Sequence, residues 1–213
     1  MRLEAHVDVA RARLRRATVT RSIASKLDGG KTYLIVEPLG RPRLWRLSTD
    51  AVVEGFTDGL AKAGALAGLA RLRTAVTAAR TLLVQRCESL IERELPDVAI
   101  LAMLLDGGEL HVHSVGPCRA YLNRRRHTER ITTRDEDASG LLESTPTETR
   151  VSLEPDDLVL AGSLSAFSSA SVSLVATVLE RDPSTAGSVI AQLLTEPAEQ
   201  SGSGAAVIVA RAR

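Results

Sequence analysis

The chain has 213 residues, with 27 lysines and arginines against 26 aspartates and glutamates, which leaves a formal net charge of +1. This balance argues against the strongly basic surface of a nucleic-acid or membrane-surface binder. Aromatic residues make up only 2% of the chain, too few for a base-stacking platform. Apolar residues make up 44%, enough for one core, so we predict a single domain over residues 1–213.

No apolar run reaches the roughly 20 residues of a membrane span, and none at the N-terminus has the length of a signal peptide. The two cysteines, Cys87 and Cys118, lie far apart and lack metal-ligand spacing. We therefore expect a complete, cytoplasmic protein with reduced thiols. Nucleic acid and membrane are not expected among its partners.

The N-terminal third predicts strands and a hairpin. Residues 2–10 follow an alternation of apolar and polar side chains, with Leu3, Ala5, Val7 and Val9 on one face, which is typical of a half-buried strand. Residues 17–25 predict a second strand, and the sequence Asp-Gly-Gly within residues 26–31 predicts a tight turn. The short apolar run 32–38 then predicts the returning strand.

Two helices are expected next. The first begins near residue 48, with Ser48, Thr49 or Asp50 as its cap. Its Gly55 and Gly59 predict close packing, because glycine in a helix costs about 1 kcal/mol relative to alanine. The second helix is predicted over Leu69–Leu95, with Cys87 on its apolar stripe.

The remainder predicts antiparallel hairpins, two helices and a last strand, with strands over 98–105, 109–116, 119–133 (a hairpin pair), 149–153, 157–163 and 205–213, and helices over 169–181 and 184–195. Hairpins dominate this order. The sequence therefore predicts an α+β fold: a two-sheet, mostly antiparallel β-sandwich flanked by helices.

Four segments, in order along the chain, resemble motifs of the metal-dependent protein phosphatases, the PPM or type 2C serine/threonine family. "VGPCRAYL" (115–122) is similar to "VGDSRAYL", and "LEPDDLVLAGS" (153–163) to "L.PGD.LLLCSDG". "SGSGAAVIVA" (201–210) is similar to "GSDNITVIVV", and "LIVEPLG" (34–40) to "VVADGMGG". The resemblance spans about 175 residues and implies the four-layer αββα fold of that family.

The resemblance also implies a site for two divalent cations, manganese or magnesium, held mainly by carboxylates and waters. At the positions that would carry those ligands this sequence has Glu37, Pro38, Ser163 and Gly204. Only Glu37 keeps a carboxylate, and one carboxylate cannot hold two metal ions. We therefore expect no catalytic residues, no metal and no cofactor: a degenerate member of the family, a pseudophosphatase.

The function we predict is that of a binding or regulatory module with a protein partner. Because arginine can hold phosphate without a metal, the basic cluster near the first strands suggests a phosphorylated partner. The candidate phosphate-binding residues are Arg13, Arg15, Arg16 and Arg21.

Two alternatives remain open. The first is a divergent manganese- or magnesium-dependent phosphatase that combines Glu37 with Asp135, Glu136 or Asp137. The second is a structural subunit of a larger assembly.

Other chemistry has weaker support. Cys118 lies beside Arg119, which suggests a thiol nucleophile, and His111 and His113 share one face of a strand, which suggests a histidine metal site. The simpler interpretations are that the thiol packs in the core and that the two histidines form a polar stripe on the strand. The arginines 124–126 are expected at an exposed hairpin tip, and the polar residues 126–148 suggest a flap.

Overall fold

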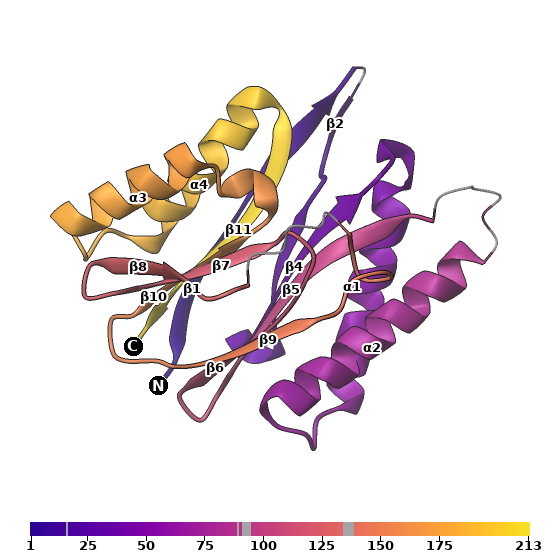
Figure 1. Cartoon of the computed structure of the whole chain (residues 1–213), viewed down its shortest axis with the longest axis horizontal. Helices are drawn as coiled ribbons and strands as arrows, with labels where there is room; N and C mark the ends of the chain where they lie inside the picture. Colours follow the sequence, from indigo (N-terminus) through magenta and orange to yellow (C-terminus); the bar gives the residue numbers. More distant parts are fainter. Residues whose placement is uncertain (16, 89, 91–94, 134–138) are drawn as a thin grey trace.

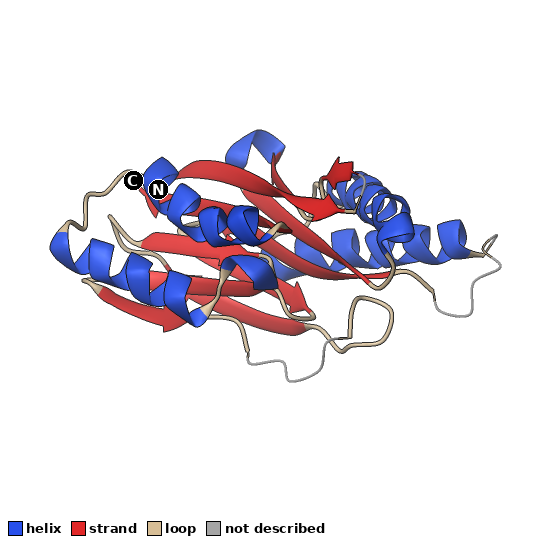
Figure 2. Ribbon diagram, turned by 90° about the horizontal axis from the view of Figure 1, so that it is seen from above, coloured by secondary structure: helices blue, strands red, loops and turns tan. Residues whose placement is uncertain are grey.

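Two β-sheets lie face to face in the computed structural model, and a pair of helices covers the outer face of each (Figure 1, Figure 2). This architecture confirms the antiparallel α+β sandwich with outer helices that the sequence predicts. The structure describes residues 1–15, 17–88, 90, 95–133 and 139–213. Among these residues, no helix is both long enough and apolar enough to span a membrane.

The first sheet combines the two ends of the chain and has the strand order β2-β1-β11-β10-β7-β8. The first and last strands of the chain pair antiparallel in this sheet, from Leu3 opposite Ala212 to Ala12 opposite Ser203. The strands are β1 (Leu3–Leu14), β2 (Ala17–Val19), β7 (Arg119–Arg124), β8 (His127–Arg130), β10 (Leu158–Gly162) and β11 (Ser203–Ala212).

The second sheet has the order β3-β4-β5-β6-β9. Tyr33 and Ile35 of β4 belong to the core between the sheets, whereas Leu34 and Val36 belong to the core under the helices. Both faces are buried, which explains the uninterrupted apolar runs in the sequence. The strands are β3 (Ile23–Leu27), β4 (Thr32–Leu39), β5 (Asp97–Asp106), β6 (Glu109–Val115) and β9 (Thr147–Ser152).

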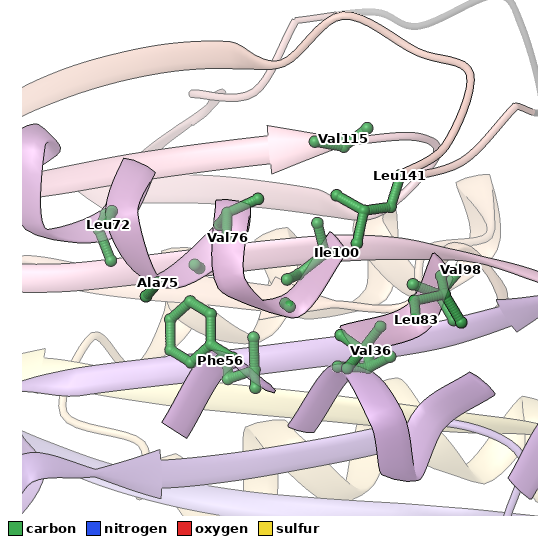
Figure 3. Close-up of a cluster of buried hydrophobic side chains, with 14 of the residues drawn as sticks. Val36, Phe56, Leu72, Ala75, Val76, Leu83, Val98, Ile100, Val115 and Leu141 are labelled. Atoms are coloured by element: carbon green, nitrogen blue, oxygen red, sulfur yellow. The ribbon is translucent and has the colours of Figure 1, made fainter. Parts of the chain in front are cut away.

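Each sheet is covered by its own pair of helices. Helices α1 (Trp45–Lys62) and α2 (Gly68–Cys87) cover the second sheet, and their core is drawn in Figure 3. Helices α3 (Ser169–Arg181) and α4 (Gly187–Ser201) cover the first sheet. The predicted close packing at Gly55 and Gly59 is confirmed, because both lie against the backbone of α2.

The predicted strand over 17–25 is wrong as a single element. The chain leaves the first sheet after β2 and enters the second at β3, so residues 20–22 form a break between two strands. The pattern of β-branched residues continues across the break, which is why periodicity alone did not reveal it. This break positions Arg21, which matters for the site described below.

Helix boundaries also differ from the predictions. Helix α1 begins at Trp45, after the short 3₁₀ helix Pro42–Leu44, because proline favours a helical start. Ser48 and Thr49 therefore lie inside the helix, where their hydroxyls donate to carbonyls of the preceding turn. Helix α2 ends at Cys87 rather than at residue 95. There the Leu90 N–H bonds to the Cys87 carbonyl in a tighter turn.

The two C-terminal helices fit their predictions unequally. Helix α3 covers the predicted residues 169–181, whereas α4 runs over Gly187–Ser201 instead of 184–195. Its C-terminus is closed by Gly202 in a left-handed conformation.

The prediction of a flap over residues 126–148 is wrong for the described part of that segment. Residues 127–130 form β8, and Leu141 is buried in the core under α1 and α2 (Figure 3). The Leu142 N–H donates to the Asp97 carboxylate. Residues 139–148 thus belong to the packed structure.

Candidate functional site

The residue at the centre of the site is Glu37, near the end of β4. Its side chain is only 2% exposed, and its Oε1 atom lies 3.2 Å from Nη2 of Arg21. The β3–β4 register pairs Ile23 with Val36, so the break before β3 brings Arg21 next to Glu37. A buried carboxylate needs such a partner, because an unpaired charge in the core is costly.

Arg21 is itself held on several sides. Its Nη1 donates to the Ser203 carbonyl at 3.3 Å, and its guanidinium carbon lies 5.3 Å from the ring centre of Trp45. The Arg21 side chain is 26% exposed, although its Nε atom is buried without a hydrogen-bond partner among the described residues. Arg21 thus joins β3, α1 and β11 around Glu37.

The second oxygen of Glu37 is also engaged. Its Oε2 accepts a hydrogen bond of 2.8 Å from the Leu164 N–H, at the start of the short 3₁₀ helix Leu164–Ala166. Burial raises the pKa of the Glu37 carboxyl, while the Leu164 hydrogen bond and the Arg21 charge act in the opposite direction. Neither carboxylate oxygen is without a protein partner.

Ser163 and Gly204 lie next to this pair, and each forms a hydrogen bond with a residue two positions from the other. The Ser163 hydroxyl accepts from the Ala206 N–H at 3.1 Å, and the Ser165 hydroxyl donates to the Gly204 carbonyl. Gly204 has a φ of +74°, and a Cβ there would lie 2.9 Å from the Cβ of Ala12. The backbone and the packing at this position therefore both disfavour a carboxylate side chain.

Pro38 completes the set of four positions. It is buried in β4, opposite Val98 of β5. The structure thus brings Glu37, Ser163 and Gly204 into one connected region, with Pro38 adjoining Glu37 in the chain.

This donor set does not fit a two-metal centre. Divalent manganese or magnesium needs several oxygen ligands with negative charge, and the only carboxylate here already faces the Arg21 cation. Across the described residues, no cluster of three or more histidine, cysteine, aspartate or glutamate side chains could hold a metal ion. The residues of the alternative prediction, Asp135, Glu136 and Asp137, lie outside the described residues.

The candidate phosphate-binding arginines are partly close together. Arg13 and Arg15 are exposed on β1 and just after it, and the Arg13 side chain lies against Gly202. Arg21 donates to the carbonyl of the neighbouring Ser203, so Arg13 and Arg21 contact adjacent residues of the α4–β11 turn. Arg16 lies outside the described residues.

The surroundings of Cys118 do not favour a nucleophilic thiolate. It is 1% exposed, and burial, followed by the charge of Glu37, raises the pKa of its thiol well above the ordinary value. A reactive cysteine needs the opposite environment. The neighbouring Arg119 donates instead to the Phe167 carbonyl.

His111 and His113 share a face of β6, as expected, and both are buried under α2. Nδ1 of His113 lies 3.0 Å from Oε1 of Glu148, and that carboxylate also accepts from Arg73 of α2. The sequence did not predict Arg73 or Glu148. The β6–β9 register, which pairs His113 with Glu148, was the signal that could have found the contact.

The chain has the fold of the PPM-type serine/threonine phosphatases, as comparison with solved structures shows. The serine/threonine phosphatase PstP of Mycobacterium tuberculosis is similar over 100% of both chains, with a TM-score of 0.80 and 18% identity. The PstP catalytic domain in complex with two manganese ions matches at 0.80 and 19%, covering 98% of this chain and 97% of that one. PppA of Pseudomonas aeruginosa, a key regulatory component of T6SS, matches at 0.77 and 16%, covering 100% and 99%.

No protein-family model matches this sequence, and no curated protein sequence matches it significantly. At identities below 20%, the structural likeness establishes the fold. Function must be argued from the site itself.

Proposed function

We propose that this chain is a pseudophosphatase: a phosphatase-fold protein without phosphatase catalysis that acts as a protein-binding or regulatory module. The observation that carries the proposal is the engagement of Glu37 by Arg21 and by the Leu164 N–H. An arginine cation beside the single carboxylate already supplies the positive charge that a metal ion would bring. Two divalent ions at this place would meet repulsion instead of ligands.

Further support comes from the neighbouring positions. Ser163 and Gly204 are bonded within the protein, and the backbone of Gly204 has no room for a side chain. The site is therefore consistent with a packed end of the sandwich that is stable without ions.

For the partner, we propose a protein that carries a phosphorylated side chain and binds at Arg13 and Arg15. Both side chains are exposed, and Arg13 lies against Gly202, next to the Ser203 carbonyl that accepts from the partly exposed Arg21. Arginine binds phosphate through paired, charge-assisted hydrogen bonds, which suits a dianionic group.

The first experiment is a calorimetric titration of manganese and magnesium into chelator-treated protein, with aryl-phosphate turnover assayed on the same sample. We expect no tight binding and no turnover. Arg21→Ala should give the same result, because the missing carboxylates, and not only the arginine, prevent metal binding. Tight binding of two ions with turnover that Glu37→Ala abolishes would overturn the proposal in favour of a divergent phosphatase.

The partner is tested separately, with fluorescent phosphoserine peptides and their unphosphorylated forms. Arg13→Gln and Arg15→Gln should each weaken phosphopeptide binding, whereas Arg46→Gln, at an exposed position on α1, should not. Equal binding of the phosphorylated and unphosphorylated forms would contradict phosphate recognition.

A structural subunit is the remaining alternative. A molar mass that rises with concentration in light scattering would favour it over a monomeric binding module.

A further inference from the structure

A charged hollow lies at the end of the first sheet opposite to the end that contacts Glu37. The register pairs Leu158 with Asn123 and with Arg211 at this end, and Gly162 with Arg119 at the other. Figure 1 shows the β7–β8 turn, the β9–β10 connection and the C-terminal end of β11 gathered here. The hollow measures about 530 Å³, within the usual range for small-molecule sites.

The walls of this hollow carry more positive than negative charge. Five arginines line it, together with three acidic residues, so the lining has an excess of two positive charges; the arginines are Arg124, Arg125, Arg126, Arg211 and Arg213, and the acids are Glu154, Asp156 and Asp157. The carboxylates are all used in ion pairs. Asp157 and Glu154 bind Arg124, Glu154 also binds Arg125, and Asp156 binds Arg213.

The excess charge resides on Arg126 and Arg211, neither of which forms an ion pair with any carboxylate in the described ranges. Arg211 is only 8% exposed, and its Nη2 donates to the Thr185 carbonyl at 3.0 Å. Burial, and then the charge of Arg213, lower the pKa of Arg211, while Asp156 is one of the acids that act in the opposite direction. A buried guanidinium without a contacting counter-ion is costly unless an anion completes its environment.

The backbone gives an independent indication. Arg125 and Arg126 form the two-residue β7–β8 turn with φ values of 51° and 70°. Such turns strongly favour asparagine and glycine, because positive φ is unfavourable for long side chains. Asp156, which also lines the hollow, has a φ of 69°. Three of the four described non-glycine residues with positive φ thus line this one hollow, and strained backbone of this kind collects at functional sites.

We propose that this arginine hollow binds a phosphate-bearing small molecule, with Arg126 and Arg211 as its main charged contacts. Arg124 is held in place by Asp157 and by the Ser152 carbonyl, so the wall is formed before a ligand arrives. Ion pairs with Glu154 and Asp156 hold Arg125 and Arg213 in the same way. This site is separate from the Glu37 region and goes beyond the proposed function.

The test is a calorimetric titration of sodium pyrophosphate into metal-free protein at low salt. The wild-type chain should bind saturably, and Arg126→Gln should weaken binding by about tenfold or more, as for a lost charge-assisted hydrogen bond. Arg46→Gln, which removes the same charge from an exposed position on helix α1, should leave pyrophosphate binding unchanged. Absence of saturable binding, or equal binding by Arg126→Gln, would overturn the proposal. Binding lost only in Arg15→Gln would place the anion at the other end of the molecule and overturn it as well.

A second variant separates ligand binding from a structural role of the turn. Replacing Arg125 with asparagine and Arg126 with glycine gives the turn its preferred residues, so the melting temperature should rise by about 2–4 °C. Pyrophosphate binding should be lost in the same variant. A fall in melting temperature would mean that the arginines stabilise the fold, and the proposal would then be wrong.

Discussion

The Nη2 atom of Arg21 lies 3.2 Å from the Oε1 atom of Glu37, where a strand break meets the end of β4. Removal of either partner should destabilise the fold, because the other would be left partly buried and unpaired. We expect Glu37→Ala to lower the free energy of unfolding by about 2–3 kcal/mol, and Arg21→Ala by a similar amount.

The double variant should lose less than the sum of the two single effects, with a coupling of about 1–2 kcal/mol. Urea unfolding followed by circular dichroism gives these values. Trp45, the single tryptophan of the chain, reports Arg21 locally, because the guanidinium lies over its ring. Strict additivity, with unchanged Trp45 emission in Arg21→Ala, would mean that the pair contributes nothing.

The burial of His113 under α2 predicts that the folded protein loses stability in acid. Burial lowers the pKa of His113 below its ordinary value of 6.5, although Glu148 acts in the opposite direction. Below pH 6.5 the unfolded chain therefore binds more protons at this residue than the folded chain does, so stability falls as the pH drops. Hydrogen bonding from Arg73 lowers the pKa of Glu148. The unfolded chain therefore also binds more protons at Glu148, so stability continues to fall at more acidic pH.

Melting temperatures measured between pH 7.5 and 5 should thus decrease steadily. The decrease should be smaller in His113→Gln, which does not titrate. If the variant and the wild type lose stability in parallel, His113 is not the group responsible.

The close contact between α1 and α2 predicts that replacing Gly59 with alanine destabilises the protein. At Gly59 a Cβ atom would lie 2.7 Å from the Cβ of Ala78 and 2.8 Å from the Cα of Ala75. Alanine normally favours a helix over glycine by about 1 kcal/mol, but overpacking here should reverse the sign and cost about 1–3 kcal/mol. Gly64→Ala serves as the control, because its Cβ would meet only the Ala61 carbonyl at 3.4 Å. A stabilised Gly59→Ala protein would contradict the close packing.

The two thiols should be inert in the folded protein. Cys87 and Cys118 are 3% and 1% exposed, and burial raises the pKa of each thiol. A disulfide reagent such as DTNB should therefore label neither cysteine before unfolding and both in urea. Rapid labelling of one thiol at neutral pH would show that its surroundings open readily.

An attempt to restore a metal ligand at the end of β11 should fail structurally. Gly204→Asp places a side chain against Ala12 and forces a left-handed backbone on a non-glycine residue. We expect the variant to lose about 2 kcal/mol or more of stability. Gly204→Ala is the matched control for packing alone, and a Gly204→Asp protein that is stabilised by manganese would contradict this expectation.

Much of the fold follows from local patterns. The apolar runs of β4 and β5 are continuous because one set of side chains faces the other sheet and the alternate set faces the helices. Helix α3 was predicted with its observed boundaries, since its apolar spacing and its Ser168 cap are both local signals. The helix ends at Trp45 and Cys87 were missed because they depend on neighbouring turns.

The site was less predictable. Glu37, Ser163 and Gly204 were selected through sequence resemblance, but the role of Arg21 as their internal counter-ion was not. Counting outward from the Asp28–Gly30 turn pairs Ile23 with Val36, which would have placed Arg21 within one residue of the position opposite Glu37. The Leu164 N–H could not have been found in this way, because that contact spans 127 residues and two different sheets.

The pairing of the first strand with the last also constrains how the molecule assembles. Residues 23–115 contain β3 to β6 and both helices that cover them, so this half can form from neighbouring segments. The other sheet cannot close until β11 lies between β1 and β10. A ribosome-bound chain would therefore form most of its second sheet early, with only the edge strand β9 to follow, whereas β1 pairs with β11 only after roughly 200 further residues have been made. Such distant contacts slow folding, and the exposed edge of β1 would be the segment most in need of protection during synthesis.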